Sequence, residues 1–324
     1  VSNPVMLSGT MTKKDAASLI DVVSADDFVP FTAPLTLDSP SEDAVYYKIC
    51  AYAADRSGNK SAYTLYDVVV DKYDYYVDAS ADKDSADGTR DNPYASLADC
   101  LAAVGDNRFA NITISGTLAV TERETLVASN CVFRGDGDAR LVFGAGSFIA
   151  VRSASLALLN LIVTRDDIGA KGKINNPLIR LEHSVLVSED CEIGASFAES
   201  GSVISADTSV VTINGCGITS SAERYSSCIS AVASKLKIID SRISTIAQTA
   251  VNFSVQDGEF ELRSSSCRVT GSYGRAVELF GGKSKITGNS FAADLRHSGT
   301  PLDAVYTDAK TISVEYGGNT ESGY

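Results

Sequence analysis

The stretch 178–244 reads LIRLEHSVLVSEDCEIGASFAESGS, then VISADTSVVTINGCGITSSAERYSS, then CISAVASKLKIIDSRIS. Placed one below the other, these segments carry the same kinds of residue at intervals of 25 positions. The equivalent positions are Ile179, Ile204 and Ile229; Ser184, Ser209 and Ser234; Leu186, Val211 and Leu236; Cys191, Cys216 and Ser241; and Ile193, Ile218 and Ile243. A fixed period between about 20 and 50 residues is typical of repeat proteins, in which each unit covers the unfinished core of its neighbour.

Each repeat unit is expected to consist of short β-strands. Apolar residues recur at every second position, as at Leu236 and Ile238, which is the spacing of a strand and not of a helix. Asp190, Gly215 and Asp240 interrupt the strands at one fixed point of the unit, where a left-handed backbone suits Asp or Gly. The sequence therefore predicts an all-β fold, a parallel β-helix with about 25 residues per coil.

The composition argues against several classes of protein. The formal net charge of −13 would repel the phosphates of nucleic acid, and no apolar run is long enough to span a membrane. The seven cysteines form an odd set without C-x-x-C spacing, so neither a disulfide framework nor a zinc site is indicated. Because Cys191 and Cys216 occupy the same place in successive units, we expect them to stack in the core, with a reactive or paired role as the alternative.

Residues 1–72 differ in character from the repeats. Two alternating strands, at about 44–54 and 62–71, flank a polar turn and predict a β-hairpin. The segment from Tyr47 to Ser61, which contains Asp55, Gly58 and Asn59, resembles the closing hairpin of fibronectin type III and immunoglobulin-like modules of bacterial surface proteins. This resemblance implies a partial β-sandwich-like module at 1–72, followed by the repeat domain at 73–324.

The segment just before the repeats predicts a helical cap. Ser96 is placed as an N-cap, with Asp99 three residues later and apolar residues at helical spacing up to Val104. Such a helix would cover the open end of the solenoid core and its first strand edge.

The same region resembles the first segment of the right-handed parallel β-helix family related to pectate lyases. The residues that carry the resemblance are Tyr75 to Asp78, Asp84, Asp87-Gly88-Thr89, Pro93-Tyr94, Ser96-Leu97 and Cys100-Leu101. The resemblance spans about 75–316, and it implies a right-handed coil.

The resemblance also implies where catalysis would take place. Pectate lyases use acidic ligands for Ca²⁺ and a neighbouring arginine as base, because a proton beside a uronate carboxylate needs a cation to acidify it and a base to remove it. The residues that match this set are Arg165, Asp166, Asp167 and Glu192. The alternative is that they are ordinary charges of loops and turns. The motifs of the polygalacturonase branch are not present together.

Two further groups of residues are candidates for binding. Asp82, Asp84 and Asp87 supply oxygens that suit Ca²⁺, although the set departs from an EF-hand loop, and a solvated capping loop is the alternative. In the C-terminal coils, Arg268, Arg275, Glu278 and Arg296 form a set suited to an anionic sugar through bidentate arginines, with scattered surface charge as the alternative.

We therefore expect an extracytoplasmic protein, secreted or on the cell surface, that recognises a carbohydrate or another extended surface ligand along one face of its solenoid. One alternative is an enzyme, a Ca²⁺-dependent polysaccharide lyase or a glycoside hydrolase that acts on acidic polysaccharide. The other is a rigid stalk within a longer surface protein. A polysaccharide or a surface glycan or protein is the expected partner, and nucleic acid is not.

Overall fold

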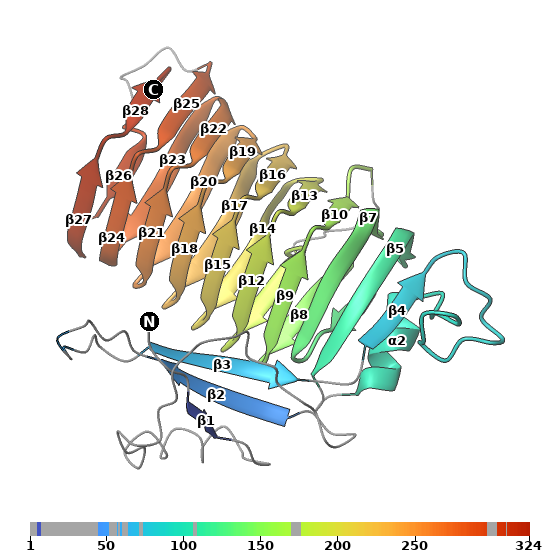
Figure 1. Ribbon diagram of the computed structural model, residues 1–324. Coiled ribbons are helices and arrows are strands. Elements are labelled where there is room, and N and C mark those ends of the chain that lie inside the picture. The colour runs from blue at the N-terminus through green and yellow to red at the C-terminus, as the bar shows by residue number, and fades with distance from the viewer. Residues whose placement is uncertain are drawn as a thin grey trace. The chain divides into compact units, whose positions relative to one another are not determined.

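The computed structural model describes residues 5–7, 45–51, 57, 59, 64–70, 74–105, 109–169, 176–296, 303–308 and 310–324. The chain divides into two compact units, Val1–Asp74 and Tyr75–Tyr324. In the first unit β1 (Val5–Leu7), β2 (Val45–Ala51) and β3 (Thr64–Val70) form an antiparallel sheet in the order β1-β2-β3 (Figure 1). Strands β2 and β3 pair as the predicted hairpin requires. Most of the predicted turn at 55–60 lies outside the described residues, and the immunoglobulin-like resemblance stays a prediction.

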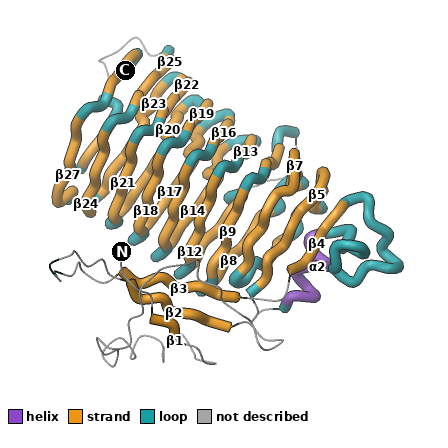
Figure 2. Tube along the Cα trace, viewed as in Figure 1, coloured by secondary structure: helices purple, strands orange, loops and turns teal. Residues whose placement is uncertain are grey.

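The second unit is a parallel β-solenoid with three faces, and Figure 2 shows the short loops that join its strands. The first face is an eight-stranded sheet of β6 (Thr125–Val127), β8 (Phe148–Arg152), β11 (Ile179–Glu182), β14 (Ser200–Asp207), β17 (Tyr225–Val232), β20 (Thr249–Gln256), β23 (Tyr273–Phe280) and β26 (Val305–Thr307). The second face contains β9 (Ser155–Leu159), β12 (Val185–Glu189), β15 (Val210–Asn214), β18 (Lys235–Ile239), β21 (Glu259–Arg263), β24 (Gly282–Thr287) and β27 (Thr311–Gly317). The third face contains β10 (Ile162–Asp166), β13 (Glu192–Phe197), β16 (Gly217–Ala222), β19 (Arg242–Ile246), β22 (Ser266–Gly271), β25 (Ser290–Leu295) and β28 (Thr320–Ser322).

The early coils are less regular than the later ones. Strand β4 (Asp74–Asp78) precedes the long strands β5 (Ala110–Val120) and β7 (Cys131–Phe143). The first residues of β7 pair with β9 on the second face and its last residues with β10 on the third face, so this strand extends around a corner. These pairings join the second and third faces into one continuous sheet.

The strand register confirms the predicted period. Ile179 pairs with Ile204 and Ile204 with Ile229, one coil apart, and all three side chains are buried. Ile229 then pairs with Phe253, which lies one residue short of the 25-residue step. Each fully buried side chain of this size contributes about 1.5–3 kcal/mol, so a row repeated through the coils makes one continuous hydrophobic core.

Hydrogen bonds between successive coils close the turn from the second to the third face. The corner residues Asp190, Gly215 and Asp240 have φ values of 52°, 64° and 49°, which is the left-handed backbone predicted for them. After each corner, a buried amide N–H donates to the side chain at the same place in the next coil. The pairs are Leu161 N–H to Cys191 Sγ, Cys191 N–H to Cys216 Sγ, Cys216 N–H to Ser241 Oγ, Ser241 N–H to Ser265 Oγ, Ser265 N–H to Asn289 Oδ1 and Asn289 N–H to Asn319 Oδ1. We call this row the turn ladder.

A shorter serine ladder closes the turn from the first to the second face. The Ser184 N–H donates to Ser209 Oγ and the Ser209 N–H to Ser234 Oγ, each at 3.0 Å. Each hydroxyl donates in turn to the carbonyl two residues earlier. The three serines are buried, so this regularly spaced row of hydroxyls serves the fold and is not accessible to a ligand. His183 lies beside it as a corner residue with φ 52°.

A helix covers the N-terminal end of the core, as predicted. Helix α2 (Leu97–Val104) begins after Ser96, whose side chain accepts from the Asp99 N–H at 3.1 Å. Leu97, Cys100 and Val104 are buried in the main hydrophobic cluster. In the part of the chain that the structure describes, no helix has the length and apolar character needed to cross a membrane.

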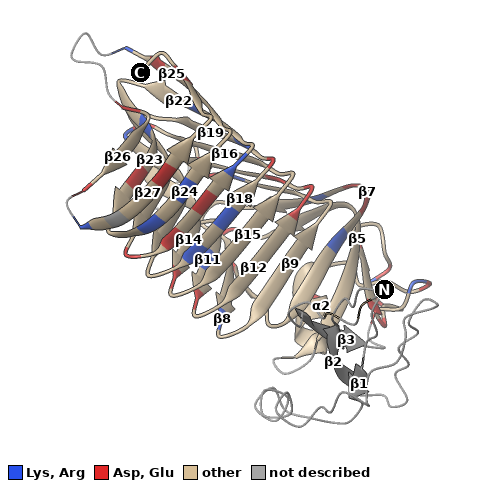
Figure 3. Ribbon diagram, turned by 60° about the vertical axis from the view of Figure 1, so that its left-hand side comes forward, with Lys and Arg blue, Asp and Glu red and all other residues tan. Residues whose placement is uncertain are grey.

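The outer surface of the second face changes character along the solenoid. Val185 and Val210 are exposed on its early strands, whereas the later strands carry alternating rows of lysine and glutamate (Figure 3). The rows are joined across strands by ion pairs at Lys235–Glu259, Lys237–Glu261 and Lys285–Glu315. These exposed pairs each contribute little to stability, at most about 1 kcal/mol.

The turn ladder yields a stability prediction. Replacing Ser241 with alanine removes the acceptor of the buried Cys216 N–H, and leaving a buried donor without a partner costs about 1–3 kcal/mol. We expect Ser241→Ala to lower the free energy of unfolding by that amount in urea titrations followed by circular dichroism. Ser313→Ala, at an exposed serine, is the control and should leave the midpoint unchanged. Equal midpoints for the two variants would contradict the structural role of the turn ladder.

Candidate functional site

The structure places two of the predicted catalytic residues, Arg165 and Asp167, inside the protein. Their side chains are 0% exposed and form an ion pair at 3.0 Å. Arg165 also donates to the carbonyls of Ser147, Pro177 and Asn176, and Asp167 accepts from the Gly146 N–H at 2.9 Å. Burial raises the pKa of Asp167 and lowers that of Arg165, so each charge depends on its partner. Both groups tie the loop after β10 to neighbouring coils, where a polymer cannot touch them.

The other two predicted catalytic residues lie apart from this pair. Asp166 is exposed, and its Oδ1 accepts from the nearby Ile168 N–H. Glu192 lies on the outer surface of the third face, where it pairs with Arg242 at 2.8 Å. The four residues therefore do not converge on one accessible point.

In the acidic loop before helix α2, two of the predicted calcium ligands accept hydrogen bonds from within the loop. Asp82 accepts from the Asp84 N–H, and Asp87 accepts from the Thr89 N–H and hydroxyl, so each carboxylate closes a local turn. Within the described ranges, no three His, Cys, Asp or Glu side chains converge on a point that could hold a metal ion.

The predicted sugar-binding residues divide between two faces. Arg275 and Glu278 lie together on β23 of the first face, with an Arg275 Nη1 to Glu278 Oε1 distance of 4.0 Å. Arg268 lies on β22 of the third face, and Arg296 is exposed just after β25. The loop 297–302 that follows Arg296 lies outside the described residues. Only Arg275 and Glu278 are brought into contact.

A column of polar side chains runs across the first face at the position of Glu278. The strand register aligns six partly exposed residues, and all but the last lie between buried neighbours. In order along the solenoid they are Arg180, Ser205, Ser230, Ser254, Glu278 and Tyr306. We call this row the polar column. Its three central serines present hydroxyl groups on successive strands, with charged or aromatic groups at both ends.

The C-terminal end of the polar column is a cluster of aromatic and charged groups. The Arg275 guanidinium lies 4.2 Å from the centre of the Tyr306 ring, and Phe280 packs against that ring at 5.8 Å. Burial raises the pKa of Glu278, and the Arg275 charge opposes this shift only in part. Burial also raises the pKa of Tyr225, the Glu278 charge adds to the shift, and hydrogen bonds with neighbouring serine hydroxyls oppose it. A half-buried carboxyl, a guanidinium and a phenol therefore share one small area.

The N-terminal end of the column has a related arrangement. The Arg180 guanidinium lies 4.9 Å from the centre of the Phe148 ring, and it donates to Asn176 Oδ1 at 3.2 Å. An arginine held against an aromatic ring thus occurs at each end of the row of serines. Such arginines are positioned in advance, which lowers the entropy cost of a hydrogen bond to a ligand.

Sequence reasoning missed the central serines of the column. The 25-residue step relates Ser205 to Ser230. The next coil is one residue shorter and places Ser254 opposite Ser230. The outward position of these serines follows from their place between buried residues such as Ile204 and Ala206. That alternation is visible in the sequence and could have identified the column.

By its register and its three parallel faces, this chain is a parallel β-helix protein. No family model and no curated protein matches it. Among solved structures, it is similar to a rhamnogalacturonan lyase, with 12% identity, a TM-score of 0.45, and coverage of 76% of this chain and 87% of that one. It is also similar to a family 28 exopolygalacturonase of Yersinia enterocolitica, with 9% identity, a TM-score of 0.29, and coverage of 100% and 94%. At these values, neither likeness carries an argument about activity.

The buried pair yields a prediction that separates structure from catalysis. Asp167→Ala leaves the Arg165 charge buried without its partner, which costs about 3–5 kcal/mol of unfolding free energy. Asp166→Ala, at the exposed neighbour, should change stability by only about 0.5 kcal/mol. Urea unfolding of both variants checks the difference. Similar unfolding midpoints would mean that the Arg165–Asp167 pair does not hold the loop.

Proposed function

We propose that this protein binds an extended polysaccharide along the first face, with the chain of sugars lying across the strands over the polar column. The observation that carries the proposal is the in-register series of three serine hydroxyls between two arginines that pack on aromatic rings. A surface that repeats along the solenoid axis suits a ligand that itself repeats.

The spacing and chemistry of the polar column suit sugars. Neighbouring strands lie about 4.8 Å apart, so the column presents one hydroxyl at each step, a spacing of the same order as one sugar unit in an extended chain. Serine hydroxyls both donate and accept, as sugar hydroxyls do. Arg275 and Glu278 can bond to neighbouring hydroxyls, and the face of Tyr306 lies beside them. The mixed charge of the column suits neutral sugars and permits acidic ones.

The proposal includes a location outside the cytoplasm, in a secreted or cell-surface protein. It is motivated by the resemblance of residues 47–61 to modules of bacterial surface proteins, and by a ligand class that is abundant outside cells. Labelling of intact cells with an antibody against residues 75–324 tests the location. Signal only after permeabilisation would contradict it.

A blocking substitution tests the polar column. Ser230 lies at its centre, so Ser230→Phe places a ring where a sugar would lie, and we expect it to weaken binding at least about tenfold. Thr212→Phe is the matched control, because Thr212 is partly exposed on the second face. Affinity electrophoresis against a panel of neutral and acidic polysaccharides identifies the ligand and measures both variants. Equal weakening of binding by the two substitutions would show that the ligand does not bind specifically on the first face. No saturable binding to any polysaccharide would favour the rigid stalk.

A second candidate function is cleavage of an acidic polysaccharide at the C-terminal end of the polar column. The observation that favours it is Glu278, a half-buried carboxyl with a raised pKa, beside Arg275 and Tyr225. A half-buried carboxyl group can accept or donate a proton, and a guanidinium can stabilise charge that develops on a uronate.

Glu278→Gln separates cleavage from binding. If the chain cleaves its ligand, the substitution should lower turnover by roughly 10²–10⁴-fold while the affinity changes much less, because the amide keeps the size of the side chain and one acceptor oxygen but cannot transfer a proton. Release of reducing ends and ultraviolet absorbance of unsaturated products measure turnover. Products formed by Glu278→Gln at the rate of the unmodified chain would eliminate Glu278 as the catalytic group. Binding without products from the unmodified chain would leave recognition as the function.

A further inference from the structure

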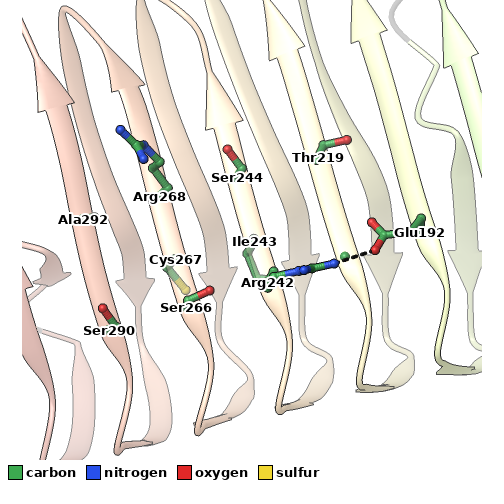
Figure 4. Close-up of a pocket in the computed structure, with 11 residues that line it drawn as sticks. Glu192, Thr219, Arg242, Ile243, Ser244, Ser266, Cys267, Arg268, Ser290 and Ala292 are labelled. Atoms are coloured by element: carbon green, nitrogen blue, oxygen red, sulfur yellow. Dashed lines mark hydrogen bonds and ion pairs between the residues drawn. The ribbon is translucent and has the colours of Figure 1, made fainter.

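The third face carries a shallow groove of about 460 Å³ that crosses strands from β13 to β25 (Figure 4). This volume lies within the range of about 300–1,000 Å³ that is common for ligand sites. Small residues such as Gly217, Ser244 and Ala292 keep its floor low, and two arginines, Arg242 and Arg268, line it. Nothing in the first-face proposal uses this groove.

At the centre of the groove, arginine and serine positions alternate on two neighbouring strands. Arg242 pairs in register with Ser266, and Ser244 pairs in register with Arg268. The two arginines therefore occupy one diagonal of a four-residue square on β19 and β22, and the two serines occupy the other. Neighbouring corners are about 4.8 Å apart between strands and about 6.7 Å apart along a strand. From these positions the two guanidinium groups extend in opposite directions, Arg242 toward Glu192 and Arg268 away from that pair, and each leaves a serine position beside it (Figure 4).

One of these arginines is held by a weak pair. Arg242 extends over the strand that contains Gly217 and pairs with Glu192 at 2.8 Å (Figure 4). Gly217 leaves room for the pair, because a Cβ at that position would meet the Glu192 carboxylate in this conformation. The side chains of the pair are 78% and 52% exposed, so their attraction is at most about 1 kcal/mol and an anion can displace Glu192.

The other arginine has no such partner. Arg268 is exposed on β22 and points away from the Glu192–Arg242 pair (Figure 4). Among the described residues, no ion pair involves Arg268. In a chain with a net charge of −13, an arginine without a carboxylate partner beside a second arginine is a local site of positive charge.

We propose that this groove binds a tetrahedral oxyanion ester, a sulfate or phosphate group carried on an extended polymer. Such a group has three terminal oxygens that point in different directions, so it can take the place of Glu192 beside Arg242, or bind Arg268, and still accept from a neighbouring serine hydroxyl. A carboxylate has two oxygens in one plane and matches a single guanidinium fork. The long, open groove permits the rest of the polymer to continue along the solenoid.

Calorimetric titration with a short heparin-derived oligosaccharide tests the proposal, and its fully desulfated form is the first comparison. Desulfation removes the sulfate esters and keeps the carboxylates, so we expect it to weaken binding at least about tenfold. A short oligosaccharide that carries phosphate monoesters forms the second arm and shows whether phosphate groups bind in the same way. Equal affinity for the sulfated and desulfated forms would overturn the proposed preference for a tetrahedral group.

Variants on the third face locate the site. We expect Arg268→Gln to weaken binding of the sulfated oligosaccharide about tenfold, and Arg268→Lys to weaken it less but measurably, because lysine keeps the charge without the fork. Glu192→Gln should strengthen binding a few-fold, since it releases Arg242 and removes a negative charge. Arg263→Gln, at an exposed arginine on the second face, is the matched control and should bind like the unmodified chain.

A comparison of variants on different faces shows whether the oligosaccharide binds in this groove or elsewhere. If Ser230→Phe weakens binding of the sulfated oligosaccharide more than Arg268→Gln does, the oligosaccharide lies on the first face and the groove is not its site. If Arg263→Gln weakens binding as much as Arg268→Gln does, the attraction is diffuse charge and the groove is not a site. Weaker binding by Glu192→Gln, or no saturable binding to either the sulfated or the phosphate-bearing oligosaccharide, would also overturn the proposal.

Discussion

The buried amide groups at the turns of this solenoid depend on side chains from the next coil. In the turn ladder, a corner with positive φ directs one N–H into the interior, and a cysteine, serine or asparagine of the following coil accepts it. An unpaired amide there would cost about 1–3 kcal/mol. The ladder thereby fixes the register of each coil on its neighbour, and the register determines which side chains are aligned on each face.

The register between coils aligns serine and arginine side chains into defined rows on the faces of the solenoid. On the first face, it aligns Ser205, Ser230 and Ser254 into a row of partly exposed hydroxyls. On the third face, it sets Arg242 opposite Ser266 and Ser244 opposite Arg268. A shift of one residue in a strand would turn every such side chain into the core, so stability and ligand binding rest on the same set of hydrogen bonds.

Charge has different consequences according to where it lies. The Arg165–Asp167 pair is fully buried and anchors a loop, whereas the Glu192–Arg242 pair is exposed and weak. On the second face, lysine and glutamate rows largely neutralise one another across strands. The charged residues available to a ligand are therefore those that are at least partly exposed and have no close, buried ion-pair partner, such as Glu278 and Arg268.

By itself, the sequence determined the coil length, the strand character, the left-handed corners at Asp190, Gly215 and Asp240, and the cap at Ser96, because each depends on local backbone preference or on a short repeat. It could not decide which charged residues are accessible. Arg165 and Asp166 are neighbours in the chain, yet one is buried and the other faces solvent. Likewise, Arg268 and Arg275 are close in sequence but lie on different faces. Only the tertiary structure decides such placements, because a side chain's surroundings are set by coils that lie a full period away along the chain.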